Sequence, residues 1–240
     1  MTDLEALGRP TMAAATVTQT TAVEQARAIA EVQAAVTVAQ AIPRDVRRAT
    51  EEMRDACGRL ALASRAFYSV PNRGNGPSVH LARELARIWG NLDYSVRELR
   101  RDDDAHQSEV LATAWDQQTN VRSSRSFQVP HEKMSGGHRK KIVDLDDIYR
   151  NNQNVGAKAV REAIFSVLPR WFVEDAQELC RATLNSGEGK PVEQRIAEAV
   201  QAFDGIGVNL ARLEAKVGKA RGQWSPADVA QLGIDYTSVT

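Results

Sequence analysis

The sequence predicts an α+β fold: a small antiparallel β-meander packed against helices, with an N-terminal helical arm and a helical C-terminal tail. Two patterns support this fold class. In the first, Leu92, Tyr94 and Val96 alternate with polar residues, which is the period of a half-buried strand. In the second, apolar residues of the segment 155–184 recur near the helical period, which indicates an amphipathic helix. Consecutive strands between helical segments favour a meander covered by helices.

The chain divides into five predicted segments. Its first residues are rich in Thr and Ala and have no durable period, which indicates a flexible terminus. Pro43 separates two helical patterns, as suits a helix start. The segments are a flexible N-terminus (1–20), a helical arm (21–64), an α+β core (65–184), a linker (185–190) and a small helical unit (191–240).

Within the core, local signals order the elements. Pro71 ends a first extended segment, and residues 72–77 have turn chemistry. Ser78 caps a helix that ends at Gly90. Pro169 is expected to divide the last helix. The predicted elements are an extended segment (66–70), a helix (78–89), three strands (92–99, 108–120 and 121–129), a basic crossover (131–143), a short helical piece (145–149) and a long helix (155–184).

Composition excludes several classes of protein. The chain of 240 residues is 42% hydrophobic and 26% charged, as soluble globular proteins are. No apolar run approaches the roughly 20 residues that span a bilayer, and Asp3 and Glu5 stand where a signal peptide needs cations. Cys57 and Cys180 have no neighbouring ligand, which argues against zinc and favours buried free thiols. We therefore expect a cytoplasmic protein with no membrane partner.

No pattern in the sequence indicates a catalytic or cofactor site. The four histidines occur singly, without a nucleophile motif or a paired metal ligand. The Gly-Asn-Gly at residues 74–76 lacks the third glycine of a dinucleotide fingerprint and the Lys-Ser/Thr of a P-loop. Asp144, Asp146 and Asp147 suit the N-terminus of a helix better than a metal site. We expect no enzyme activity, no cofactor and no metal ion.

Positive charge is concentrated in one part of a chain whose net charge is zero. Residues 120–161 contain nine basic and four acidic residues. Alternation along the strand 121–129 places Arg122, Gln128 and two serines on a polar face, and Arg125 on the apolar face. A nucleic-acid strand bound without sequence readout needs cations along its phosphates and amide or flat side chains near its bases. This segment offers both, although a merely solvated sheet face and loop would have the same composition.

Three further features suit a single strand. The Gly/Asn loop at Arg73 and the Gly/Lys/Arg loop at 134–141 can follow a line of phosphates. The amide run at 151–154 is predicted to open a helix, whose N-terminus favours an anion. Tyr68 is the aromatic residue best suited to stack on a base, whereas Trp115 is expected in the core. The candidate contacts are Tyr68, Arg73, Arg97, Arg122, Arg125, Gln128, Arg139, Lys140, Lys141, Asn152, Lys158 and Arg161.

The order of elements and several short motifs resemble a known family. Ala-Arg-Ile-Trp-Gly-Asn at 86–91 closes the helix before the meander, and the tail contains Gly-Val-Asn-Leu-Ala-Arg-Leu-Glu at 207–214 and Trp-Ser-Pro-Ala-Asp-Val at 224–229. Residues 60–235 thereby resemble the bacteriophage single-strand annealing proteins of the RecT, Red-beta and Erf group. The resemblance implies ATP-independent binding of single-stranded DNA and annealing of complementary strands in phage homologous recombination, by an oligomeric ring or helical filament.

The resemblance also implies the partners. They are single-stranded DNA, the annealed duplex intermediate and further copies of the chain, in the cytoplasm of a bacterial host. A phage exonuclease and a host single-strand-binding protein are candidates for a further partner. The long Ala-rich N-terminal helices depart from the family pattern and leave the subunit arrangement open. The main alternative is an oligomeric structural or adaptor protein of a phage without annealing activity, and a metal-dependent nuclease is a weaker third.

Overall fold

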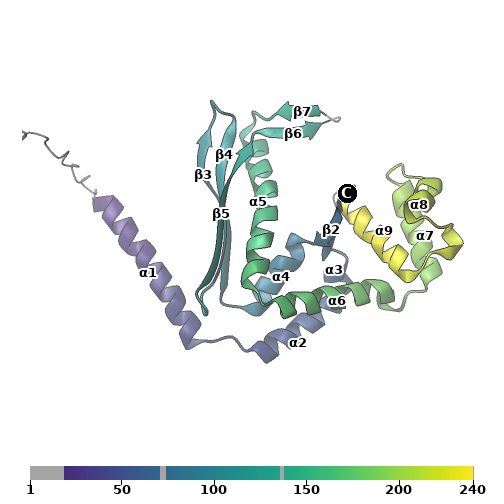
Figure 1. Ribbon diagram of the computed structural model, residues 1–240, viewed down its shortest axis with the longest axis horizontal. Coiled ribbons are helices and arrows are strands. Elements are labelled where there is room, and N and C mark those ends of the chain that lie inside the picture. The colour runs from purple at the N-terminus through teal and green to yellow at the C-terminus, as the bar shows by residue number, and fades with distance from the viewer. Residues whose placement is uncertain (1–18, 71–73, 136–137, 240) are drawn as a thin grey trace, which may run out of the picture. The chain divides into compact units, whose positions relative to one another are not determined.

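The structure, a computed structural model, describes residues 19–70, 74–135 and 138–239 (Figure 1). The chain falls into two compact units, Met1–Ile42 and Pro43–Thr240. The α+β class predicted from the sequence is confirmed, with small antiparallel sheets in the second unit and helices on both sides of them in the chain.

The described part of the first unit is α1 (Gln19–Ala41), a helix rich in Ala and Val. Its exposed side chains include Val23, Ile29 and Val38. The predicted flexible N-terminus, up to residue 18, and the predicted contact Arg73 both lie outside the described residues. No helix in the described part of the chain combines the length and apolarity needed to cross a bilayer.

The sheet forms the predicted meander. β3 (Leu92–Asp102), β4 (Gln107–Asp116) and β5 (Val121–Pro130) pair antiparallel in that order. Residues of β4 alternate strictly between half-buried and buried, so one face of the sheet is covered. A register shift between Glu98 and Arg100 marks a bulge in β3. The buried residues of β4 are Ser108, Val110, Ala112, Ala114 and Asp116.

α5 (Leu145–Val167) covers that face of the sheet (Figure 1). The side chain of Asp144 caps it by accepting hydrogen bonds from two backbone N–H groups of the first turn, as the sequence predicted. Gly156 approaches the sheet so closely that a Cβ there would lie 2.3 Å from Val96 Cγ1. Gly156 therefore marks the sheet-facing side of α5. The helix is continuous from Leu145 to Val167, where a short helical piece and a separate long helix were expected.

Four more helices build the main core with α5. Pro169 is the N-cap residue of α6 and divides the predicted long helix, because proline cannot continue a helix from within. Leu81, Ile164 and Phe172 are fully buried at the centre of this core. The helices are α2 (Val46–Cys57), α3 (Leu60–Ala63), α4 (Val79–Trp89) and α6 (Arg170–Ser186).

α2 and α3 belong to the main core, whereas the sequence grouped them with the N-terminal arm. Met53 and Cys57 of α2 and Ala63 of α3 are fully buried there. The boundary between the two units accordingly follows Ile42. The thiols of Cys57 and Cys180 hydrogen-bond to each other, and this bond together with burial raises the pKa of Cys180. Both are buried free thiols, as expected.

The structure contains two short hairpins. β1 (Phe67–Val70) pairs with β2 (Gly74–Pro77), and β6 (Glu132–Ser135) pairs with β7 (His138–Lys141). β1 lies in the predicted extended segment 66–70, whereas β2 lies in the predicted turn 72–77, and β6 and β7 lie in the predicted basic crossover 131–143. Every residue of β7 is exposed, so no alternation of apolar and polar residues marks it in the sequence. Backbone hydrogen bonds, which nearly every residue type can make, hold both hairpins.

The C-terminal tail has a small core of its own and also joins the main core. Phe203, Leu213 and Trp224 are buried together in the small core. Ala230 and Ile234, from the last helix, pack in the main core. The tail consists of α7 (Val192–Asp204), α8 (Leu210–Val217) and α9 (Pro226–Val239), with short 3-10 turns at Gly187–Gly189 and Arg221–Gln223.

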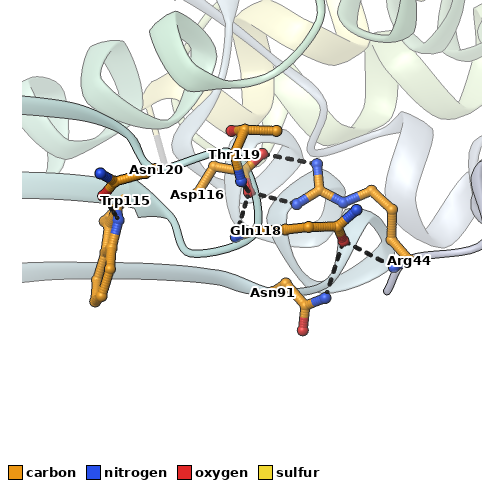
Figure 2. Close-up of polar contacts among 7 residues, drawn as sticks. All are labelled: Arg44, Asn91, Trp115, Asp116, Gln118, Thr119 and Asn120. Carbon is orange, nitrogen blue, oxygen red and sulfur yellow. Dashed lines mark hydrogen bonds and ion pairs between the residues drawn. The ribbon is translucent and has the colours of Figure 1, made fainter. Parts of the chain in front are cut away.

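Arg44 ties the start of the second unit to the turn between β4 and β5 (Figure 2). Its guanidinium makes two hydrogen bonds, of 2.7 and 2.5 Å, to the Asp116 carboxylate. Its backbone N–H donates to Gln118 Oε1, which also accepts from Asn91 Nδ2. Burial acts to raise the pKa of Asp116, but the hydrogen bonds from Arg44 and Thr119 outweigh it and hold that pKa below its usual value. We call this group the turn clamp.

Candidate nucleic-acid interface

The face of the sheet opposite α5, the outer face, carries part of the predicted polar surface. Its side chains are those that alternate with the buried residues of β4, together with their cross-strand neighbours. The register pairs Arg97 with Leu111, and Leu111 in turn with Ser126. Positive and negative residues balance on this face, which weakens its attraction for an anionic strand. Its charged residues are Arg97, Arg100 and Arg122, and Asp93, Asp102 and Glu109.

Trp115 lies on the outer face, half-buried, and not in the core as expected. Its Nε1–H donates to Asn120 Oδ1 over 3.1 Å (Figure 2). Arg122 Cζ lies 3.9 Å from the centroid of the indole. Since the guanidinium already occupies that ring face, a base can stack there only by displacing Arg122.

A second set of polar side chains, three cations and one amide, lies on the other side of α5. Arg150, Asn154, Lys158 and Arg161 recur at intervals of three and four residues, so they form one stripe along the helix, the α5 stripe. Gly156 faces the sheet, and Lys158 follows it by about 200° of helical rotation, so the stripe points away from the sheet. The stripe is about 17 Å long at 1.5 Å per residue. Neither Arg150 nor Lys158 has an ion pair within the described part of the chain.

The β6–β7 hairpin continues the basic surface beyond the first turns of α5. Lys133 Nζ lies 2.7 Å from Asp147 Oδ2, and Asp147 precedes the α5 stripe by one helical turn on the same side. Figure 1 shows the hairpin extending from that end of α5 away from the sheet. Arg139 makes a 3.5 Å contact with Glu132 and stays 78% exposed. The exposed cations of the hairpin are Lys133, Arg139, Lys140 and Lys141.

At its other end the α5 stripe borders a pocket of about 490 Å³, which we call the β1 pocket. Lys158 and Arg161 line it from α5. Arg161 Cζ lies 4.7 Å from the centroid of the Tyr68 ring, and its Nη2 lies 2.6 Å from Glu162 Oε1. Gly76 lies against the same ring, where a Cβ would come within 3.0 Å of the Tyr68 hydroxyl oxygen. Tyr68 therefore positions Arg161. Its ring is covered by Arg161 and Gly76, so it does not offer a free face for a base to stack on.

The contacts predicted for one strand do not lie on a single surface. α5 and the sheet separate them into two groups on opposite sides. Arg125 belongs to neither group, because its register with Ala112 puts it on the covered face, at the edge strand β5. The outer face holds Arg97, Arg122 and Gln128, whereas the α5 side holds Tyr68, Arg139, Lys140, Lys141, Lys158 and Arg161.

The amide run does not open a helix. α5 begins at Leu145, so the residues 151–154 lie inside it, where the backbone N–H groups are engaged in the helix. Asn152 is 2% exposed on the sheet-facing side of α5. Its side chain lies near Glu98 and contributes to the lowered pKa of that carboxylate. Asn152 therefore cannot touch a strand in this fold, and the predicted anion site at this run is absent from the described helix.

Three residues of the α5 side were missing from the prediction. Arg65 and His80 line the β1 pocket, and Arg65 Nη2 lies 3.3 Å from His80 Nδ1. Burial, Arg65 and Arg83 lower the pKa of His80, so its neutral ring can accept a hydrogen bond from Arg65. No local pattern marks these two residues. Arg150 has a signal, its helical spacing to Lys158, which the expected break before residue 155 concealed.

A buried polar cluster between the sheet and α5 superficially resembles a hydrolase triad. Ser108 Oγ donates to Glu98 Oε1 over 2.9 Å and lies 2.8 Å from His131 Nε2. In a triad the carboxylate accepts a hydrogen bond from the second ring nitrogen of the histidine. Here the Glu98 carboxylate contacts the serine instead. Ser108 and His131 are 0% and 1% exposed, so no substrate reaches them. The cluster locks β3 and β4 to the chain that follows β5.

No family model, curated protein or solved structure matches the chain. A function therefore has to follow from the two faces themselves. The outer face has balanced charge, and Arg122 already covers its tryptophan ring. The α5 side has more cations than carboxylates, and its stripe borders a pocket lined by cations.

Proposed function

We propose that the chain binds single-stranded DNA along the α5 stripe and the β6–β7 hairpin, and anneals complementary strands without ATP. One observation carries this proposal: Lys140, Lys141, Arg150 and Lys158 are exposed, and none forms an ion pair among the described residues, although Asp147 lies near Arg150. Unpaired cations bind phosphates with release of counterions, which gives an affinity that does not depend on base sequence. The proposal narrows the predicted interface to this side of α5.

Annealing needs little beyond such a surface. Cations along one strand reduce its repulsion of a second strand, and an extended backbone leaves the bases free to pair. Asn154 adds an amide among the cations of the α5 stripe. No group in this surface has to undergo chemistry, so base pairing alone selects the partner strand.

A short basic surface binds weakly by itself, so the proposal includes other copies of the chain. Exposed Val23, Ile29 and Val38 on α1 support contact between copies, because apolar side chains gain free energy when they leave water. Copies in a row bind one strand with a combined affinity that far exceeds that of each copy. The same α1 side chains also favour the second candidate, a structural or adaptor protein that assembles without DNA.

A fluorescence annealing assay separates the two candidates. Two complementary oligonucleotides, one with a donor and one with a quencher, are mixed with the full chain in the absence of nucleotide and divalent metal. We expect faster pairing than in buffer, weakening steeply between low and moderate salt. Particle size is measured in parallel with and without oligonucleotide. Pairing at the buffer rate, with assembly that ignores DNA, would favour the adaptor protein.

A further inference from the structure

We propose that the β1 pocket is a binding site for a phosphate monoester, and that its natural occupant is the terminal phosphate of a DNA strand lying on the α5 stripe. This inference rests on the proposed function and deepens it. The pocket adjoins the stripe through two shared residues, Lys158 and Arg161. A strand that follows the stripe away from the β6–β7 hairpin therefore arrives at this pocket.

The charges that line the β1 pocket all have one sign. Arg65, Lys158 and Arg161 contribute cations, and no carboxylate is among the described lining residues. A phosphate monoester carries nearly two negative charges at neutral pH, because its second pKa is about 6, whereas an internal phosphodiester carries one. Three cations lining one pocket therefore favour a strand end over an internal phosphate.

Two of these cations are held in place before any ligand arrives. Tyr68 and Glu162 fix the Arg161 guanidinium at the pocket wall. The ring of His80, which also lines the pocket, contacts Arg65. Side chains that are already ordered lose less entropy on binding, which raises affinity for a ligand of matching charge.

The backbone adds donors to the same pocket. Ser78 caps α4 by accepting the N–H of Leu81, and Ser78, Val79 and His80 all line the pocket. The N–H groups of Val79 and His80 have no partner in the described part of the chain. Free N–H groups in the first turn of a helix favour an anion, so they complement the three cations.

The size and walls of the pocket match the end of a strand. A volume of about 490 Å³ exceeds what a phosphate alone requires and falls in the range of small-molecule pockets. Phe67, Val70 and Ala157 supply an apolar wall that a sugar or base can contact. The last turn of α9, at Thr237 and Ser238, bounds the pocket on one side, and Ser69 N–H donates to Ser238 Oγ there.

The test compares oligonucleotides of one sequence that carry a 5′-phosphate, a 3′-phosphate or no terminal phosphate. We expect the full chain to bind one phosphorylated form roughly tenfold more tightly than the unphosphorylated form. Arg65→Gln should abolish this preference, measured as the ratio of the affinities of the same variant for the phosphorylated and unphosphorylated forms, since Arg65 lines the pocket. Lys140→Gln with Lys141→Gln, the control, should weaken all three forms by the same factor. Equal affinity of the full chain for all three forms would overturn the inference.

A second measurement separates failure of the inference from failure of the proposed function. Inorganic phosphate is titrated against the full chain and against Arg65→Gln, and the unfolding temperature is followed. If no oligonucleotide binds, the proposed function fails, but a phosphate-dependent rise in Tm that Arg65→Gln removes would still support the pocket. No rise, or an equal rise in both proteins, would contradict it.

Discussion

Arg44 in the turn clamp and Arg161 in the β1 pocket lie on aromatic rings at the same distance. Arg44 Cζ is 4.7 Å from the centroid of Trp89, and Arg161 Cζ is 4.7 Å from that of Tyr68. Stacking of this kind contributes up to about 2 kcal/mol when the pair is removed from water. The stacks alone therefore do not distinguish the two arginines.

The carboxylate partners of Arg44 and Arg161 distinguish the two arginines. The side chains of Arg44 and Asp116 are 6% and 3% exposed, so the pair is closed off from solvent. Arg161 is 16% exposed beside a pocket, and its partner Glu162 is 57% exposed and so screened by water. An arginine with a buried carboxylate holds the fold together, whereas one with a solvated carboxylate keeps charge for a ligand. The first two of the following predictions test this difference at Arg44 and at Arg161.

The largest effect is expected at the turn clamp. Arg44→Ala leaves Asp116 buried without its partner, which should lower the free energy of unfolding by about 3–5 kcal/mol in urea denaturation. Arg48→Ala is the matched control, because Arg48 is exposed on α2 and has no ion pair among the described residues. Its effect should stay within about 0.5 kcal/mol. Equal losses in the two variants would show that the turn clamp does not stabilise the fold.

A smaller effect is expected at Tyr68. Tyr68→Leu removes the ring that positions Arg161, and should weaken binding of a labelled oligonucleotide about three- to tenfold, as the energy of an exposed or partly buried cation–π contact implies. Tyr68→Phe keeps the ring and should bind as the unaltered chain does. Fluorescence anisotropy measures both. If Tyr68→Phe bound the oligonucleotide as weakly as Tyr68→Leu, the hydroxyl group of Tyr68 and not its ring would be needed for binding.

The smallest effect is expected at His131, whose protonated form is disfavoured by burial in the folded protein. Burial and nearby Arg101 lower the pKa of His131 in the folded protein, against weaker opposing effects of Asp103 and Glu98. Because the unfolded chain takes up a proton first, stability is present above the ordinary histidine pKa of about 6.5 and is lost as pH falls through the folded value.

Urea denaturation between pH 7.5 and pH 5 checks this prediction. The free energy of unfolding should fall toward pH 5, and His131→Asn should remove part of that fall even if it lowers stability overall. A pH dependence unchanged by His131→Asn would contradict the assignment. Glu98 and Asp116, whose pKa values are lowered, lose their contributions only at more acidic pH.

Local patterns predicted the parts of the fold in which one side of an element is buried. The alternation in β3 and β5 placed Arg122 and Gln128 on the polar face, where the register puts them. Pro169 marked the start of α6 because of its fixed geometry. The hairpin β6–β7 was missed because its residues are exposed or half-buried and show no alternation that a pattern could reveal.

The site was harder to predict than the fold. The order of strands and helices in the sequence does not say that α5 lies between Arg97 and Lys158, so contacts proposed for one strand fall on two faces. The run at 151–154 was expected to open a helix, but the cap at Asp144 lies two turns earlier. Arg65 reaches the pocket only through the pairing of β1 with β2 and the packing of α4, which no local pattern encodes.

The salt dependence of oligonucleotide binding in two matched double variants tests the central claim most directly. Lys140→Gln with Lys158→Gln removes two cations from the α5 side, and Arg97→Gln with Arg122→Gln removes two from the outer face. We predict that the first pair lowers the slope of log affinity against log salt by about 1.4, at about 0.7 for each lost phosphate contact, and that the second leaves it unchanged. The reverse result would show that the strand lies on the outer face and would contradict the account.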